Sequence, residues 1–161
     1  MWTIARLIHL NGAPGIGKSS LARRYLDDHP LALLLEVDAL RTSLGRRSDH
    51  EESKVVARDL ALALADRHFG AGYDVVVPQL LARPEFIEAL EGVALRAGAG
   101  FIEVLLEVDL TVNIERFWAR RSALLDRGEP HPQADVLDHE VEEVISAAND
   151  ELTQISRPGR E

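Results

Sequence analysis

The stretch GAPGIGKSS, residues 12–20, decides the fold of this chain. It follows the apolar run RLIHL, residues 6–10, which predicts a short buried strand. It leads into residues 18–29, where apolar side chains recur on one helical face until Pro30. The sequence therefore predicts a strand, a glycine-rich turn and a helix in direct succession.

This turn matches the pattern G-x-x-x-x-G-K-[ST] of a phosphate-binding P-loop, with Gly12, Gly17, Lys18 and Ser19 at the fixed positions. Glycines let backbone N–H groups point inward, and the amino end of the new helix adds positive potential. We expect Lys18 to reach the β- and γ-phosphates of ATP and Ser19 to ligate Mg²⁺. The predicted nucleotide-binding residues are Gly12, Ala13, Pro14, Gly15, Ile16, Gly17, Lys18, Ser19 and Ser20. The alternative is a glycine-rich turn with an incidental Lys-Ser pair.

Composition limits what the chain can be. With 161 residues, 46% hydrophobic and 28% charged, it fits one globular domain over residues 1–161. It has no cysteine, which excludes disulfides and thiol chemistry. The net charge of −9 argues against long nucleic acid as the main ligand and leaves room only for a local basic groove. No apolar run of about 18 residues and no leader pattern occurs, so we expect a cytoplasmic protein without a membrane span.

Apolar runs and helical patterns alternate along the rest of the chain. Further strands are expected at 31–38, 73–79 and 101–109, with a polar loop over 41–49. A capping box of Asp49 and Glu52 predicts a helix of about five turns that ends at Gly70. Its expected apolar stripe is Val55, Val56, Leu60, Ala61 and Leu64. Pro84 can begin the next helix. We therefore predict a three-layer α/β fold with a parallel sheet of four or five strands and helices on both faces.

Two omissions separate this chain from other P-loop proteins. It has no Asn-Lys-x-Asp segment for reading a guanine base, and its third strand ends in Pro78-Gln79 rather than in an acid. Both favour a small kinase. The segments GAPGIGKSSLARRY and LEVDALRTSLG resemble the small P-loop kinases grouped with phage polynucleotide kinase, chloramphenicol phosphotransferase and zeta toxins. The resemblance covers the first half of the chain well and the remainder by layout.

That resemblance implies roles for two residues. Asp38 matches the base that activates the acceptor hydroxyl, and Arg41 matches the arginine of a D-x-x-R pattern that contacts the acceptor. From the residues alone, a carboxylate after a parallel strand lies on the edge where such sheets bind ligands, and it could accept a proton there. Gln79 is expected on the same edge as a possible acceptor contact. The alternatives are that Asp38 caps a helix and that Arg41 is a surface arginine.

Arginines gather after the fourth strand, in a predicted lid over about 116–135. At about 100° per residue, Arg116, Arg120 and Arg127 form one polar stripe, whereas Arg121 falls among apolar residues and predicts a bend or a phosphate contact. ERFWARR also resembles the start of the lid in adenylate-kinase-like enzymes, which implies that Arg116 and Arg120 contact the nucleotide. Arg120 is the first candidate for stabilising the transferred phosphoryl group. The alternative is a solvated stripe that pairs with the acidic last helix.

The final residues, ELTQISRPGRE, show no convincing fifth strand, which leaves the adenine site open. We expect an ATP-dependent phosphotransferase acting on a hydroxyl of a small-molecule acceptor, with Mg²⁺ as cofactor. The alternatives are a nucleotide-binding regulatory protein or weak NTPase and, among kinases, a polynucleotide 5′-hydroxyl kinase or a zeta-toxin-like nucleotide-sugar kinase. The sequence identifies neither the acceptor nor the oligomeric state.

Overall fold

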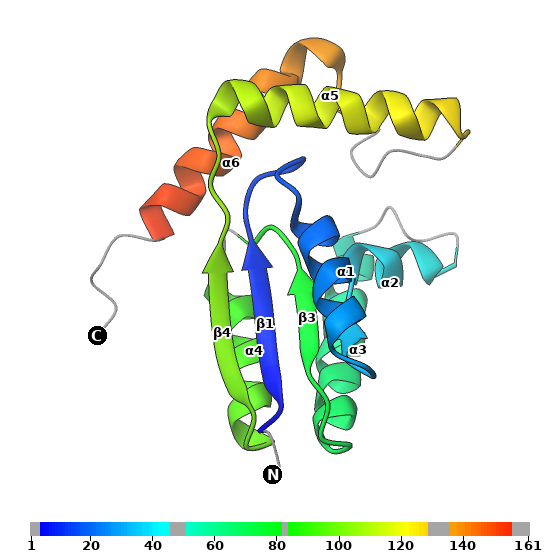
Figure 1. The fold of residues 1–161 in the computed structure, drawn as a ribbon, viewed down its shortest axis with the longest axis vertical. Coiled ribbons are helices and arrows are strands. Elements are labelled where there is room, and N and C mark those ends of the chain that lie inside the picture. Colours follow the sequence, from blue (N-terminus) through cyan, green and yellow to red (C-terminus); the bar gives the residue numbers. More distant parts are fainter. Residues whose placement is uncertain (1–3, 46–50, 82–83, 129–135, 156–161) are drawn as a thin grey trace.

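The computed structural model describes residues 4–45, 51–81, 84–128 and 136–155 (Figure 1). The strands are β1 (Arg6–Asn11), β2 (Leu33–Leu34), β3 (Val75–Pro78) and β4 (Gly100–Leu105). The helices are α1 (Lys18–Asp28), α2 (Val37–Ser43), α3 (Glu51–Phe69), α4 (Pro84–Arg96), α5 (Leu110–Asp126), the 3₁₀ turn η1 (Asp138–Glu140) and α6 (Val141–Ile155). The predicted alternation of strands and helices is confirmed.

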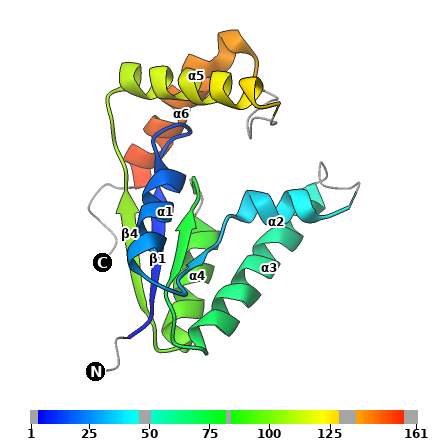
Figure 2. The ribbon, with the colours of Figure 1, turned by 45° about the vertical axis from the view of Figure 1, so that its right-hand side comes forward.

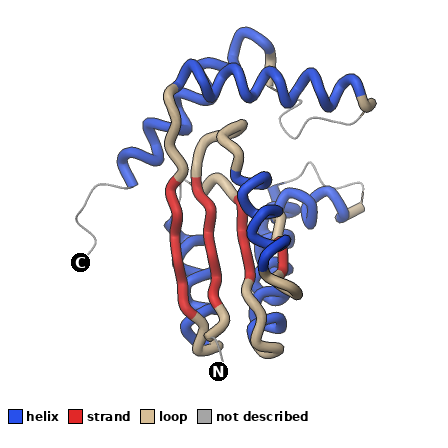
Figure 3. Tube along the Cα trace, in the orientation of Figure 1, coloured by secondary structure: helices blue, strands red, loops and turns tan. Residues whose placement is uncertain are grey.

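One parallel sheet of four strands, in the order β2-β3-β1-β4, forms the centre of the described chain (Figure 3). β1 lies between β3 and β4, and its Leu7 is in register with Val75 and Phe101. All strands point the same way, so their carboxyl ends meet at one edge. The predicted α/β class is therefore confirmed, with a P-loop NTPase-like topology.

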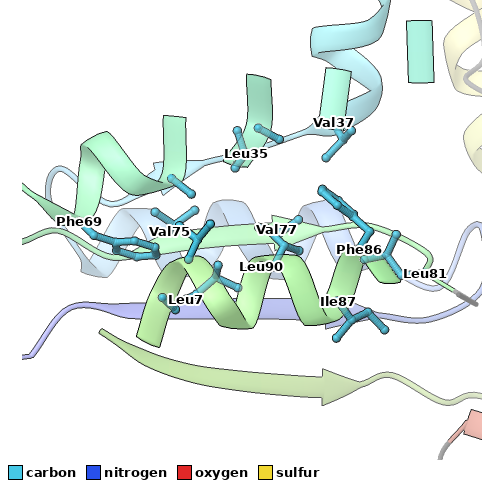
Figure 4. Close-up of a cluster of buried hydrophobic side chains, with 14 of the residues drawn as sticks. Leu7, Leu35, Val37, Phe69, Val75, Val77, Leu81, Phe86, Ile87 and Leu90 are labelled. Carbon is cyan, nitrogen blue, oxygen red and sulfur yellow. The ribbon is translucent and has the colours of Figure 1, made fainter. Parts of the chain in front are cut away.

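Helices cover both faces of the sheet. α1 packs on one face, α3 and α4 pack on the other, and α5 crosses above the carboxyl ends of the strands (Figures 1 and 2). The core on the α3–α4 face includes Leu7, Val75, Val77, Phe86 and Leu90 (Figure 4). None of the helices in the described part of the chain is both long and apolar enough to cross a membrane.

The second strand is shorter than the sequence suggested. Only Leu33 and Leu34 are strand, although the N–H groups of Leu33 and Leu35 donate to the carbonyls of Asp74 and Val76. Leu31 has a φ of 69°, which an extended strand cannot include. α2 begins at Val37, so the predicted strand over 31–38 and the start of the predicted loop over 41–49 are wrong.

The buried face of α3 also differs from the prediction. Ser53, Ala57, Ala61, Ala65 and Phe69 are buried, whereas Val55, Val56, Leu60 and Leu64 are each at least 41% exposed. Of the expected stripe, only Ala61 faces the core. Alanines allow α3 to lie close to its neighbours α2 and α4, and the larger side chains remain outside. The capping residue Asp49 lies outside the described residues.

We expect a substitution that adds apolar atoms on the buried face of α3 to destabilise the protein more than one that removes them on the exposed face. Ala61→Leu should destabilise the protein by about 1–3 kcal/mol, because Ala61 is fully buried and added methylenes overpack the core. The matched change Leu60→Ala, on the exposed side, should cost under about 1 kcal/mol. Urea denaturation of both variants measures the difference, and a larger loss for Leu60→Ala would contradict the observed orientation of α3.

Candidate functional site

The turn between β1 and α1 has the backbone geometry of an anion-binding loop. Gly15 and Gly17 have φ values of 83° and 111°, in the left-handed region that favours glycine. Gly17 is the N-cap of α1, where no side chain caps the helix and no acidic residue occupies the first turn. The amino-terminal N–H groups and the dipole of α1 are thus directed at the space enclosed by the loop.

Lys18 folds back into this loop. Its Nζ donates to the carbonyl oxygens of Gly12 at 2.7 Å and Ala13 at 2.9 Å. Burial lowers the pKa of Lys18 to about 8, with a further lowering by the charge of Arg120 and an opposing rise from the charge of Asp38. The structure therefore brings Lys18, Arg120 and Asp38 within electrostatic range of one another. Ser19 lies half-buried in the first turn of α1.

Asp38 lies in the first turn of α2 with its side chain exposed. The N-cap of that helix is Glu36, so Asp38 does not occupy the cap position considered above. Gln79, just past β3, places its Nε2 at 3.5 Å from Asp38 Oδ2. Gln79 follows β3 and Asp38 lies in α2, so the contact joins two different elements.

Arg41 lies one turn after Asp38 and is directed toward α3. Its Nε donates to Ser53 Oγ at 2.9 Å. Ser53 is buried, so the contact fixes α2 against α3. Arg41 therefore has a structural contact that supports the helix carrying Asp38, and its role at the acceptor stays a prediction.

α5 lies directly against the loop. Phe117 is 1% exposed and packs in one cluster with the fully buried Ala13. A Cβ at Gly15 would lie 3.2 Å from the N, Cα and Cβ of Phe117. Arg116, one residue earlier, donates from its guanidinium to the carbonyl of Ile16 at 3.3 Å. Arg116 thus contacts the loop, and Arg120 lies within electrostatic range of Lys18.

Arg121 is paired within the protein. α5 runs without interruption from Leu110 to Asp126, so the bend considered for this position is absent. The Arg121 guanidinium donates to the carbonyl of Val136 at 3.0 Å, lies 3.3 Å from Asp138 Oδ1 and stacks over Trp118. A phosphate is not needed to balance this charge. Arg127 is the C-cap of α5, and the remainder of the predicted lid, residues 129–135, lies outside the described residues.

Sequence reasoning missed three polar side chains beneath the loop. His9 and Asn11 of β1 are 0% and 1% exposed, and Glu103 of β4 lies beside them. The available signal was the replacement of apolar residues by His9 and Asn11 in a strand that is covered on both faces. Their partners, on the segment after β3, could not be identified without the sheet register.

The close approach of Phe117 predicts unequal effects of two glycine substitutions. Gly15 and Gly72 have nearly equal φ values, 83° and 84°, so alanine strains the backbone by about 1–2 kcal/mol at either position. Nothing lies within 4 Å of a Cβ at Gly72, whereas one at Gly15 meets Phe117. Gly15→Ala should therefore destabilise the protein by at least about 1 kcal/mol more than Gly72→Ala. Equal denaturation midpoints would show that α5 does not confine the loop.

Solved structures with the same fold include several kinases. A putative kinase from Chloroflexus aurantiacus J-10-fl aligns with a TM-score of 0.66 and 19% identity over 91% of this chain and 78% of its own. The Mycobacterium tuberculosis APS kinase CysC in complex with AMPPNP and APS aligns at 0.58 and 20%, over 93% and 98% of the two chains. A chain of the PezAT toxin–antitoxin system of Streptococcus pneumoniae aligns at 0.62 and 16%, over 96% and 64%.

These likenesses confirm the α/β P-loop fold that the sequence predicted. Among curated proteins, no sequence match was found. A family model described as an AAA domain matches residues 7–141, from the second residue of β1 to the first residue of α6. The match contains the loop, Asp38, Gln79 and the arginines of α5. Because it covers most of the sequence, this chain belongs to that AAA domain family of P-loop proteins.

Proposed function

We propose that this protein is an ATP-dependent phosphotransferase that moves the γ-phosphoryl group of Mg·ATP to a hydroxyl of a small-molecule acceptor. The observation that carries the proposal is that Lys18, held in the loop by the carbonyls of Gly12 and Ala13, lies within electrostatic range of both Arg120 and Asp38. A carboxylate that could act as a base is therefore near the cationic phosphate site. A phosphate-binding loop alone would need no such base. The kinases among the structures of the same fold support this reaction class.

The chain supplies a residue for each requirement of the transfer. The acceptor oxygen forms a bond to the γ-phosphorus, and the bond from that phosphorus to the β-γ bridging oxygen breaks, with its electron pair leaving on ADP. Asp38 accepts the proton of the acceptor hydroxyl. Lys18 and Arg120 stabilise the negative charge on the moving phosphoryl group. Arg116, held at Ile16, closes the loop from the side of α5.

The residues also fit Mg·ATP. Lys18 lies in the loop against neutral carbonyl groups with a lowered pKa, so a phosphate would supply the anionic partner that it lacks there. The Ser19 hydroxyl, in the first turn of α1, would hold Mg²⁺ together with phosphate oxygens and water. Bound Mg²⁺ would neutralise charge on the phosphates during transfer. Gly15, Gly17 and the amino end of α1 supply N–H donors for the phosphate oxygens.

Two kinds of acceptor are compatible with the exposed Asp38 and with Gln79 beside it. A compact alcohol, such as a sugar, nucleoside or antibiotic, fits the acidic net charge of −9, because it does not require a basic track. A polynucleotide 5′ end or a nucleotide-sugar would need cations on the acceptor side, where Arg41 is one candidate. The first class is the one that we propose.

Replacing Asp38 should abolish transfer while leaving nucleotide binding intact. Asp38→Asn keeps the shape of the side chain but cannot accept the proton, so acceptor-stimulated ADP release should fall by about 10²-fold or more. ADP release from Mg·ATP can be measured across nucleosides, aminoglycosides, chloramphenicol-like compounds, sugars, UDP-sugars and a 5′-hydroxyl oligonucleotide. The affinity for Mg·ATP, measured by calorimetry, should stay within about threefold.

A matched control is Asp59→Asn, because Asp59 is an exposed carboxylate on α3 away from the loop. It should leave ADP release unchanged. Acceptor-independent hydrolysis that persists in Asp38→Asn would instead support a weak NTPase. Absence of Mg·ATP binding in the wild type would support a partner-binding module with a degenerate site.

Nucleotide affinity should weaken above about pH 8. In the free protein the pKa of Lys18 is about 8, and phosphate contact raises it in the complex. Binding thus takes up a proton between these two pKa values, and affinity should fall about tenfold per pH unit in that interval. Below pH 8 Lys18 is already charged and contributes no pH dependence. Calorimetric titration with Mg·AMPPNP from pH 7 to 10 measures this slope, which Lys18→Met should remove; a flat profile for the wild type would contradict the assignment.

A further inference from the structure

A polar network lies inside the sheet, below the loop and away from any proposed substrate. Asn11, the last residue of β1, uses all four hydrogen-bonding positions of its amide. Its Nδ2 donates to the carbonyl of Leu81 at 3.0 Å and to Glu103 Oε1 at 3.1 Å. Its Oδ1 accepts from the N–H groups of Gly12 at 3.0 Å and Leu81 at 3.1 Å. Asn11 thereby joins the first glycine of the loop to the segment that follows β3.

His9 makes a second connection to the same segment. Its Nε2 lies 3.0 Å from the carbonyl oxygen of Gln79. Because a carbonyl can only accept, Nε2 must carry the hydrogen. Burial also lowers the pKa of His9, which favours the neutral ring. His9 Nδ1 is buried, makes no hydrogen bond within the described part of the chain, and lies 3.5 Å from Glu103 Oε1.

Burying these polar side chains costs desolvation free energy that apolar side chains would not cost. His9 and Asn11 face the same side as Leu7, and apolar residues there would avoid the desolvation of an imidazole and an amide. Both polar residues occur at the carboxyl half of β1, where the strand approaches the loop. Both reach across to the three residues that follow β3, which are Gln79, Leu80 and Leu81. The network therefore fixes the backbone of one particular segment.

That segment leads to the candidate base. The carbonyl of Gln79 is held by His9, and its side chain donates to Asp38 Oδ2 at 3.5 Å. The exposed Asp38 carboxylate has no other hydrogen bond shown among the described residues. The position of Gln79 relative to the loop thus depends on two side chains of the strand that carries the loop.

We propose that His9 and Asn11 are positioning residues that lock residues 79–81 to the beginning of the P-loop, so that Gln79 holds Asp38 in line with the transferred phosphoryl group. This inference rests on the proposed phosphotransferase function. Neither residue is placed to touch substrate: His9 acts through the carbonyl of Gln79, and Asn11 acts through the backbone of Leu81. Loss of His9 should therefore lower the rate of transfer to the acceptor, whereas the affinity of the loop for nucleotide should remain.

The variants separate the hydrogen bond from the burial of the side chain. His9→Leu removes the donor to Gln79, and His9→Gln offers an amide N–H in a comparable place. Asp74→Asn is the matched control, because Asp74 accepts from the Arg6 side chain at 2.8 Å and from Tyr25 at 2.6 Å at the opposite end of the sheet. It disturbs a polar link between β1 and β3 without touching residues 79–81.

We expect His9→Leu to lower kcat/KM for the acceptor by about tenfold or more, with the Kd of Mg·AMPPNP within about twofold of wild type. His9→Gln should recover most of the loss. Asp74→Asn should lower Tm while leaving kcat/KM for the acceptor and the Kd of Mg·AMPPNP unchanged. In a Gln79→Ala background the effect of His9→Leu should disappear, because His9 acts through Gln79. Equal losses in nucleotide affinity and acceptor kinetics, or additive effects with Gln79→Ala, would overturn the proposal.

Amide hydrogen exchange tests the anchoring without any turnover. The N–H of Leu81, bonded to Asn11 Oδ1, should exchange at least about tenfold faster in Asn11→Leu than in wild type or Asp74→Asn. Unchanged exchange would overturn the anchoring itself. A third outcome is faster exchange in Asn11→Leu, together with a wild-type protein that shows no acceptor-stimulated ADP release. The anchoring would then stand, but the proposed function and the catalytic consequence of the anchoring would have failed.

Discussion

The confinement of one short loop from three sides is the constraint on which the rest of this structure depends. Asn11 binds the Gly12 N–H from below, the Phe117 backbone approaches Gly15 from above, and Lys18 binds two loop carbonyls from within. Only glycine fits where backbone direction and this close approach coincide. The loop is therefore held in shape by the strand, the helix and the cation together.

This confinement also explains the electrostatics of the site. Enclosing Lys18 removes it from water, and the loop carbonyls compensate only in part, so its pKa falls. An anion with several oxygens would compensate more fully, because it would engage the ammonium, the N–H groups of the loop and the dipole of α1 together. The net charge of −9 does not prevent anion binding here, because the potential at the loop depends on the charges nearest to it. Lys18, Arg116 and Arg120 converge here.

The sequence predicted those features of the fold that a local pattern determines. The glycine spacing, the beginning of α4 at Pro84 and the alternation of elements all depend on neighbouring residues. The orientation of α3 was predicted wrongly because a count of large apolar side chains favours Val56 and Leu60, whereas close helix packing selects Ala57 and Ala61. Arg121 appeared unpaired because its partners, Val136 and Asp138, lie beyond the end of α5. Long-range partners of this kind leave no periodic signal.

The strand order places the segment after β3 between the phosphate loop and the candidate base. β3 lies between β1, which carries the loop, and β2, which leads to Asp38. Residues just past the end of β3, such as Gln79, are therefore placed between the loop and Asp38. The register pairs Leu10 with Pro78, so Asn11 and Gln79 follow at the same level of the sheet. This parallel register brings His9 to Gln79 and Asn11 to Leu81, and in the proposed mechanism these contacts make the position of Asp38 depend on the strand that holds the phosphate loop.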